Sequence, residues 1–334
     1  MDLASLRPAI AVQLPVMEPA VTEPLVRIRD LQVSFHGVPA LRGIDLEVGP
    51  GEAVGLVGES GCGKSVTWLA ALGLLPGAAR VAGSVRLRGE ELLGAPARAL
   101  ERVRGGKVAM IFQDPASALN PVIPVGRQVM EALALHRGLT GAAARAEALR
   151  LLEQVGIPDP ARRLAAYPHE MSGGQNQRVM IAMALAGRPD LLIADEPTTA
   201  LDATIQAQIL DLLRQIRQDH GMARVLISHD LGVVADMCDR VGVMYAGRMI
   251  EQAPADAVFG QPAHPYTQGL LAALPDMAGP RRRLAAIPGG VPRPEEMPPG
   301  CAFAPRCPRA DAACAAGVPP LRAVGAQHQA ACVK

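Results

Sequence analysis

The sequence predicts an α/β fold with a parallel sheet at its core. Short apolar runs, interpreted as strands, alternate with helical patterns over much of the chain, and this alternation is typical of a parallel sheet covered by helices. A glycine-spaced loop also lies between an apolar run at 53–57 and a helical pattern that begins near Trp68. We therefore expect a strand–loop–helix unit at the centre of the fold.

Length and composition fit a globular protein with two domains. The chain has 334 residues, of which 49% are apolar and 19% charged, as in ordinary soluble proteins. The formal net charge is only +1, so the chain as a whole is not attracted electrostatically to nucleic acid or to an anionic membrane. No apolar run approaches the roughly 20 residues of a membrane span. Residues 1–23 lack the order of a signal peptide, so we expect a flexible leader and a cytoplasmic protein without disulfides.

The first part of the chain is predicted to hold the strands that lead to the glycine-spaced loop. Apolar and polar residues alternate over 25–35, which indicates a half-buried strand, and 41–48 is expected to be a second strand. Pro50-Gly51 is a turn signal before the strand at 53–57. A hairpin edge is expected around Arg88-Gly89-Glu90, and a further strand at 108–112.

The rest of the chain changes character twice. Apolar residues at helical spacing over 127–137 and 142–155 predict a helical insertion at about 116–172. Strands and helices then alternate: a helix to 186, a strand at 191–194, a helix at 205–220, a strand at 225–227 and two strands around Ala246-Gly247. From about 259 the chain is rich in proline and cysteine, so 259–334 is expected to be a separate small module.

The loop after the strand at 53–57 has the spacing of a phosphate-binding loop. Its pattern G-x-x-x-x-G-K-[ST] comprises Gly58, Glu59, Ser60, Gly61, Cys62, Gly63, Lys64 and Ser65. The glycines allow several backbone N–H groups to surround a polyphosphate, and the following helix adds its positive end. Lys64 is expected to reach the β- and γ-phosphates, and Ser65 to bind Mg²⁺. The loop therefore predicts binding of a nucleoside triphosphate.

Two carboxylates follow the apolar strand at 191–194. Asp195 is placed to hold Mg²⁺ directly or through water. Glu196 is the natural general base for the attacking water. The pair predicts that the bound nucleotide is hydrolysed.

Further motifs resemble those of the ATP-binding cassette (ABC) ATPases. Met171-Ser172-Gly173-Gly174-Gln175 is similar to their signature sequence, and the run from Asp195 to Asp202 resembles their Mg²⁺ site and D-loop. The motifs extend from residue 25 to about 258 in the order the family has them. The resemblance implies an ABC nucleotide-binding domain at 24–258, with a RecA-like mixed sheet, an antiparallel β edge and a helical subdomain at about 116–172.

The resemblance also implies roles for single residues. Phe35 resembles the aromatic residue that stacks on adenine, and a core position on its strand is the alternative. Gln113 would offer its amide to Mg²⁺ or to the lytic water. His229 would contact the γ-phosphate as the switch histidine and would steady Glu196 as the catalytic base.

The signature implies a dimer. Ser172, Gly173, Gly174 and Gln175 open a predicted helix, whose N–H groups and serine hydroxyl form an anion site. In this family that site closes on the ATP held by a second subunit. Asp202 resembles the D-loop residue that crosses the interface, so hydrolysis is expected to need a second ABC ATPase subunit.

Two other stretches resemble the dipeptide/oligopeptide importers within the family. They are the run from Asp114 to Pro121 and the element Ala263-His264-Pro265-Tyr266-Thr267, which is similar to the His-Pro-Tyr element of their C-terminal extension. This implies an ATPase that powers peptide import at the cytoplasmic face of the inner membrane. Its partners would be a similar ATPase in a heterodimer, two transmembrane permease subunits and, indirectly, an extracytoplasmic binding protein. Nickel importers share much of the pattern, so the cargo stays open.

Two other functions remain as alternatives. A soluble ABC ATPase acting on nucleic acid or ribosomes would be expected to carry a coiled coil, duplicated cassettes or a basic arm, and the sequence indicates none of them. A regulatory partner with little hydrolysis of its own would be expected to lack catalytic residues, yet Lys64, Glu196 and His229 are present.

Four of the six cysteines lie in the final module: Cys301, Cys307, Cys314 and Cys332. Such a density in a cytoplasmic protein favours metal ligation over disulfides, and the gaps do not match the Cys-x₂₋₄-Cys pairs typical of structural zinc. Four thiolates suit a [4Fe–4S] cluster, which the resemblance to related importer subunits also implies. Four free thiols in a structural cap are the alternative.

Overall fold

The computed structural model describes residues 23–199, 201–274 and 286–334. The predicted leader at 1–22 lies outside the described residues. The strands are β1 (Val26–Phe35), β2 (Val38–Val48), β3 (Ala53–Val57), β4 (Ala79–Leu87), β5 (Glu90–Glu91), β6 (Val108–Ile111), β7 (Leu191–Asp195), β8 (Ala223–Ile227), β9 (Arg240–Tyr245), β10 (Arg248–Pro254), β11 (Arg322–Gly325) and β12 (His328–Ala330).

The helices fall mainly in the middle of the chain. They are α1 (Lys64–Ala71), α2 (Ala97–Val103), α3 (Pro115–Ala118), α4 (Val125–Arg137), α5 (Gly141–Gln154), α6 (Pro160–Arg163), α7 (Gly173–Ala186), α8 (Ala203–His220), α9 (Leu231–Met237), α10 (Ala255–Gly260) and α11 (Pro265–Ala272). Short 3₁₀ helices lie at Pro168–Glu170, Pro294–Glu296, Ala304–Arg306 and Ala312–Ala315.

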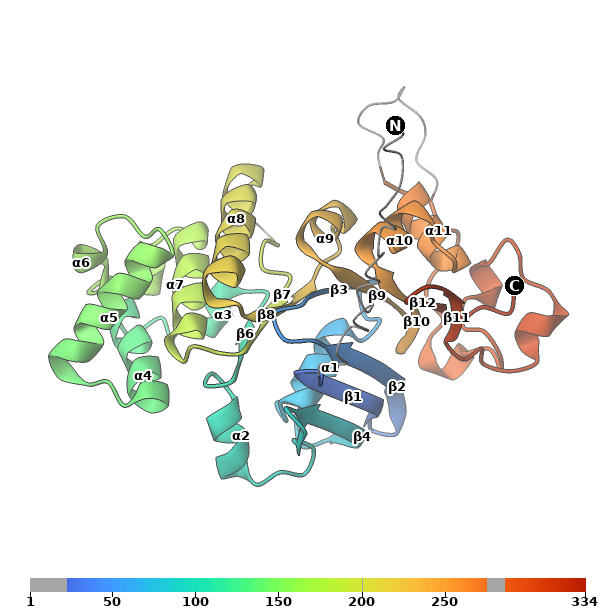
Figure 1. Cartoon of the computed structure of the whole chain (residues 1–334), viewed down its shortest axis with the longest axis horizontal. Coiled ribbons are helices and arrows are strands. Elements are labelled where there is room, and N and C mark those ends of the chain that lie inside the picture. Colours follow the sequence, from blue (N-terminus) through green and yellow to red (C-terminus); the bar gives the residue numbers. More distant parts are fainter. Residues whose placement is uncertain (1–22, 200, 275–285) are drawn as a thin grey trace, which may run out of the picture.

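Two sheets organise the described part of the chain (Figure 1). One is antiparallel, in the order β2-β1-β4-β5. The other has the order β11-β12-β10-β9-β3-β8-β7-β6 and is parallel from β9 to β6. The predicted α/β fold with a parallel core and an antiparallel β edge is confirmed, and so is the hairpin edge, since β4 and β5 pair across Arg88-Gly89.

The parallel strands separate two cores because side chains alternate between the two faces of a strand. In β7, Leu191 and Ile193 contribute to a core shared with α1 and the antiparallel sheet. Leu192 and Ala194 contribute to a core on the other face, together with α4, α5, α7, α8 and α9. All five residues of β7 are buried, so the apolar run in the sequence reflects burial on both faces.

Helices lie in the segment where the helical insertion is predicted, and its bounds at about 116–172 stay a prediction. Helices α3 to α6 fill this segment, and α4 and α5 pack on α7. In Figure 1 these helices form a lobe at one end of the molecule. The lobe packs on α7, which begins within the predicted signature and also contacts β6 of the parallel sheet.

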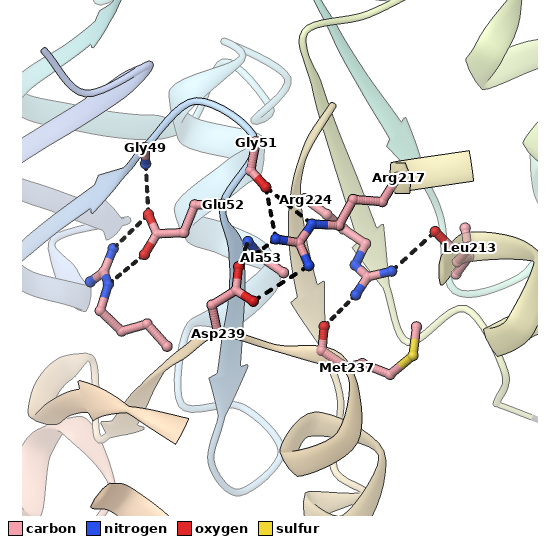
Figure 2. A network of polar contacts seen from close by, with 10 residues as sticks. Gly49, Gly51, Glu52, Ala53, Leu213, Arg217, Arg224, Met237 and Asp239 are labelled. Carbon is pink, nitrogen blue, oxygen red and sulfur yellow. Dashed lines mark hydrogen bonds and ion pairs between the residues drawn. The ribbon is translucent and has the colours of Figure 1, made fainter. Parts of the chain in front are cut away.

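A polar network fixes the start of β3 (Figure 2). The Asp239 carboxylate accepts a hydrogen bond from the Ala53 N–H at 2.8 Å, and Arg217 donates to the Gly51 carbonyl at 2.8 and 3.0 Å. The buried Arg224 donates to the carbonyls of Leu213 and Met237. These bonds anchor the amino end of the strand whose carboxyl end carries the glycine-spaced loop.

The C-terminal segment differs from the expected separate module. β12 pairs with β10 through Glu251–Ala330 and Gln252–Gln329, and β11 pairs with β12. These strands therefore extend the same sheet that holds β3. The boundary at 259 stays a prediction, but the segment shares a sheet and a core with the rest of the chain.

Candidate functional site

The glycine-spaced loop is tightly confined by its neighbours. Gly58 has a φ of +149°, and a Cβ placed on it would lie 2.3 Å from the Met244 carbonyl oxygen. Gly63 has a φ of +105°, and a Cβ there would lie 2.4 Å from Leu41 Cδ2. Only glycine fits both the backbone conformation and the space at these two positions. Residues of β2 and β9 thus restrict the loop to one shape at these two positions.

Lys64 and Ser65 lie at the start of α1, as the loop pattern predicts. The Lys64 side chain is buried, and its Nζ donates to the carbonyls of Gly58 at 2.8 Å and Glu59 at 3.2 Å. The Ser65 hydroxyl donates to Asp195 Oδ1 at 2.9 Å. Burial raises the pKa of Asp195, and the Ser65 hydrogen bond opposes that effect. A hydroxyl beside a carboxylate is a donor set that suits Mg²⁺.

Three predicted catalytic side chains meet at the carboxyl ends of β6, β7 and β8. Gln113 Nε2 donates to Glu196 Oε2 at 3.0 Å, and His229 Nδ1 lies 3.6 Å from the same oxygen. The Thr199 hydroxyl also donates to Glu196 Oε2, at 3.0 Å. Glu196 has a φ of +47°, in the left-handed region that non-glycine residues seldom adopt, and such strain is frequent at active sites. Gln113 contacts Glu196 here, so its predicted Mg²⁺ contact stays a prediction.

The signature residues form a self-contained helix start. Ser172 caps α7: its hydroxyl accepts from the Gln175 N–H at 3.3 Å, and the Gln175 side chain accepts from the Ser172 N–H at 3.1 Å. Ser172 and Gly173 are exposed. Gly174 faces Ile205, and a Cβ there would lie 2.7 Å from Ile205 Cγ2. The capping box holds the amino end of α7 ordered while leaving it open to solvent.

The other predicted residues occupy varied places. Asp202 caps α8, where its carboxylate accepts from the N–H groups of Thr204 and Ile205. Phe35 ends β1 and packs, partly buried, against the core of the antiparallel sheet, so its adenine contact stays a prediction. Cys62 is almost fully buried, and burial raises the pKa of its thiol.

The structure adds two residues that sequence reasoning did not single out. The Tyr266 hydroxyl accepts the Glu59 N–H at 2.9 Å. Arg306 donates to both carboxylate oxygens of Glu59, at 2.7 and 2.9 Å. Both residues come from the C-terminal segment, Tyr266 in the His-Pro-Tyr element and Arg306 immediately before Cys307. In the sequence, only their position in or next to these two motifs could have indicated a role for Tyr266 and Arg306.

The four C-terminal cysteines line one pocket. Cys301 donates its N–H to the Cys314 carbonyl at 2.8 Å. Burial raises the pKa of the Cys301 thiol, and the nearby Cys314 and Cys332 thiols add to the rise. However, no group of three or more His, Cys, Asp or Glu side chains is placed to hold a metal ion within the described ranges. The side-chain positions therefore do not support the predicted [4Fe–4S] cluster.

Family comparisons agree with the fold and the loop. Residues 41–199 match the ABC transporter family, and residues 250–314 match the family described as oligopeptide/dipeptide transporter, C-terminal region. The chain is 51% identical over 309 residues to a putative peptide import ATP-binding protein of Brucella abortus, an alignment that covers 91% of this chain and 93% of that protein. It is 50% identical over 317 residues to the oligopeptide transport ATP-binding protein OppD of Mycobacterium tuberculosis, covering 93% of this chain and 52% of OppD.

Solved structures show the same architecture. CbiO1 from Clostridium perfringens, part of the ABC transporter complex CbiONQ, matches with a TM-score of 0.62 and 27% identity over 72% of this chain and 92% of that chain. The ATP-binding cassette MJ0796, in a dimeric post-hydrolysis state bound to ADP and Pi, matches with a TM-score of 0.61 and 26% identity over 69% of this chain and 98% of that chain.

The fold and the phosphate loop thus define an ABC-type ATPase. The chain belongs to the ABC transporter family, and its tail matches the C-terminal region of the oligopeptide/dipeptide transporters. Among its described helices, none combines the length and the apolar character needed to span a membrane.

Proposed function

We propose that this ATPase powers the import of peptides through an ABC transporter. The observation that carries the proposal is the meeting of Gln113, Glu196 and His229 beside the Ser65–Asp195 pair. This arrangement suits hydrolysis of a bound triphosphate. The names of the two relatives described above, and the match of the tail to the oligopeptide/dipeptide transporter region, favour peptides over nickel as cargo.

The loop and its neighbours are proposed to divide the chemistry as follows. Backbone N–H groups of the loop other than that of Glu59, together with the Lys64 ammonium, bind the phosphates, and Phe35 contacts adenine. Ser65 and Asp195, with Gln113, would hold Mg²⁺, which neutralises charge on the phosphates when bound. Glu196 accepts a proton from the attacking water. His229 and Thr199 keep the Glu196 carboxylate oriented toward that water.

Completion of the site by a second subunit is also part of the proposal. Ser172, Gly173, Gly174 and Gln175 present an exposed helix start, which suits the γ-phosphate of ATP held by a partner ATPase. Asp202 would lie at that interface. The partner is a similar ATPase in a heterodimer, and the pair docks on two permease subunits at the cytoplasmic face of the inner membrane. An extracytoplasmic binding protein delivers the peptide to these permease subunits.

A cluster in the tail is a separate proposal. Cys301, Cys307, Cys314 and Cys332 line one pocket, and four thiolates are the usual ligands of a [4Fe–4S] cluster. Protein purified without oxygen should contain iron and acid-labile sulfide and show a broad brown absorption. Zinc, or no metal, in that protein would refute the cluster.

The transport role can be tested by isolating the complex from native membranes. Tagged full-length chain should copurify with two membrane-spanning subunits and a second ATPase. In the isolated complex, peptide with its binding protein should stimulate ATP hydrolysis. Ribosomes or DNA in the eluate, with no membrane subunits, would contradict the importer and favour the alternative of a soluble ATPase. Stimulation by nickel alone would overturn the peptide cargo.

A further inference from the structure

The second residue of the phosphate loop is held by the C-terminal segment. Arg306 makes a two-pronged ion pair with Glu59, with Nη1 2.7 Å from Oε2 and Nη2 2.9 Å from Oε1. Bidentate pairs of this kind are among the strongest polar contacts, and they fix the orientation of both groups. Tyr266 contacts the backbone of the same residue through its hydroxyl. Glu59 is therefore held at both its side chain and its N–H.

Arg306 is itself locked in place. Its Nε donates to the Pro288 carbonyl at 2.9 Å, and its Nη1 also donates to the Tyr245 hydroxyl at 3.3 Å. The guanidinium carbon lies 5.8 Å from the centre of the Tyr245 ring and 5.9 Å from that of Phe303, within the range of cation–π attraction. The side chain is buried. A side chain with so many partners can hold Glu59 in one position without losing entropy at each binding event.

The charge of Glu59 matters because of where it sits. Glu59 follows Gly58 in the loop whose N–H groups are to receive a polyanion, and Lys64 already donates to the Glu59 carbonyl. An unpaired carboxylate in this loop would carry a negative charge that repels the phosphates. Arg306 cancels that charge, and Tyr266 occupies an N–H that would otherwise let the loop rearrange.

We propose that Arg306 and Tyr266 are positioning residues for the phosphate loop, through which the C-terminal segment sets the affinity of the cassette for MgATP. Neither residue contacts the nucleotide in this proposal; both act through Glu59. The inference rests on ATP binding by the loop and does not depend on the transported cargo.

The test compares MgATP dissociation constants of full-length variants, measured by equilibrium dialysis with ATP. Arg306→Gln should weaken binding about tenfold, a size typical of coupling between linked sites. Tyr266→Phe removes only the hydroxyl and should weaken binding by a smaller factor. The matched control is Arg309→Gln, because Arg309 lies in the same segment but donates to Gln268 and is exposed. This control should bind MgATP as the unaltered chain does.

A double variant separates positioning from general damage to the fold. In Glu59→Gln/Arg306→Gln the carboxylate is gone, so most of the lost affinity should return, whereas a fold damaged by loss of Arg306 would stay weak. Thermal unfolding of each variant reports on the fold itself. Unchanged affinity in Arg306→Gln, or no recovery in the double variant, would overturn the inference. If the unaltered chain bound no MgATP, the proposed function would fail instead.

Discussion

The two ends of the proposed ATP site are built in opposite ways. The phosphate loop is enclosed at its two ends: Lys64 and Asp195 are buried, and residues of β2 and β9 contact Gly63 and Gly58. The signature at Ser172 is exposed, and the hydrogen bonds of its cap join Ser172 and Gln175 within the first turn of α7. Distant strands shape the first end, whereas local capping bonds order the second.

This difference shows which contacts the chain completes by itself. The buried Lys64 ammonium donates to carbonyls of its own loop. It can exchange these acceptors for phosphate oxygens without help from a second subunit. An exposed, capped helix start offers free N–H groups to something outside the chain. We therefore expect substitutions at the loop to change ATP binding by a single chain, and substitutions at the signature to change the response to ATP only in the assembled pair.

The largest effect should come from Glu196→Gln. Loss of the proposed base should lower the rate of ATP hydrolysis about 10³-fold, while ATP binding and ATP-driven pairing persist because Lys64 and Ser172 are intact. Steady-state hydrolysis and size-exclusion chromatography with ATP measure the two properties. Glu101→Gln, an exposed change in α2, serves as the control. Hydrolysis at the normal rate would rule out Glu196 as the base.

Lys64→Ala should strongly weaken the binding of MgATP to the phosphate loop. Because the ammonium is the buried cation of the loop, its removal should weaken MgATP binding by about two orders of magnitude. The matched control is Lys107→Ala, since Lys107 is only partly buried and its Nζ lies 3.8 Å from Glu90 Oε2. Equilibrium dialysis gives both affinities, and equal values would show that the loop does not bind the phosphates as proposed.

Acid should lower the free energy of unfolding, because it protonates His264, which caps the helix that carries Tyr266. Burial lowers the pKa of His264 to about 4, and its Nδ1 must stay unprotonated to accept the Tyr266 N–H at 3.0 Å. The unfolded chain takes up a proton near pH 6.5, so stability is present above that pH and is lost as the pH falls toward 4. The loss should total about 3 kcal/mol.

Chemical unfolding between pH 7 and pH 4 measures this loss. His264→Asn keeps a capping acceptor that does not titrate, so its stability should depend less on pH over the same range. An equal dependence in both proteins would mean that another group is responsible.

The smallest effect should come from Ser172→Ala at the exposed end. Removal of the cap should cost about 1 kcal/mol of stability and weaken ATP-driven pairing, yet leave the MgATP affinity of the single chain unchanged. Thr140→Ala is the control, because Thr140 precedes α5 without a side-chain cap bond. If Ser172→Ala lowered the MgATP affinity of the single chain, the signature would not act only on ATP held by a partner.

The sequence predicted much of the fold because local patterns determine it. Buried parallel strands give uninterrupted apolar runs, as at β7 and β8, and the helical spacing over 142–155 gave α5 almost to the residue. The loop pattern likewise located Lys64 and Ser65 because its spacing follows from the turn itself.

The remainder depends on contacts between distant parts of the chain. Nothing near Glu59 indicates that its carboxylate meets Arg306, because the two are 247 residues apart. The short β11 and β12 carry few apolar residues and give no strand signal; their pairing with β10 depends on tertiary context. The cysteine spacing shows which donors are present but not where their side chains point.

The pairing of β12 with β10 has a consequence for solubility and turnover in the cell. β10 carries the buried Met249 and Ile250, and an uncovered strand of this kind is a template for pairing with other chains. β11, the outermost strand, is short and exposed and carries Arg322, which makes it a poor template. A chain cut before residue 322 would expose β10, and we expect it to aggregate or be degraded rather than persist as a free cassette.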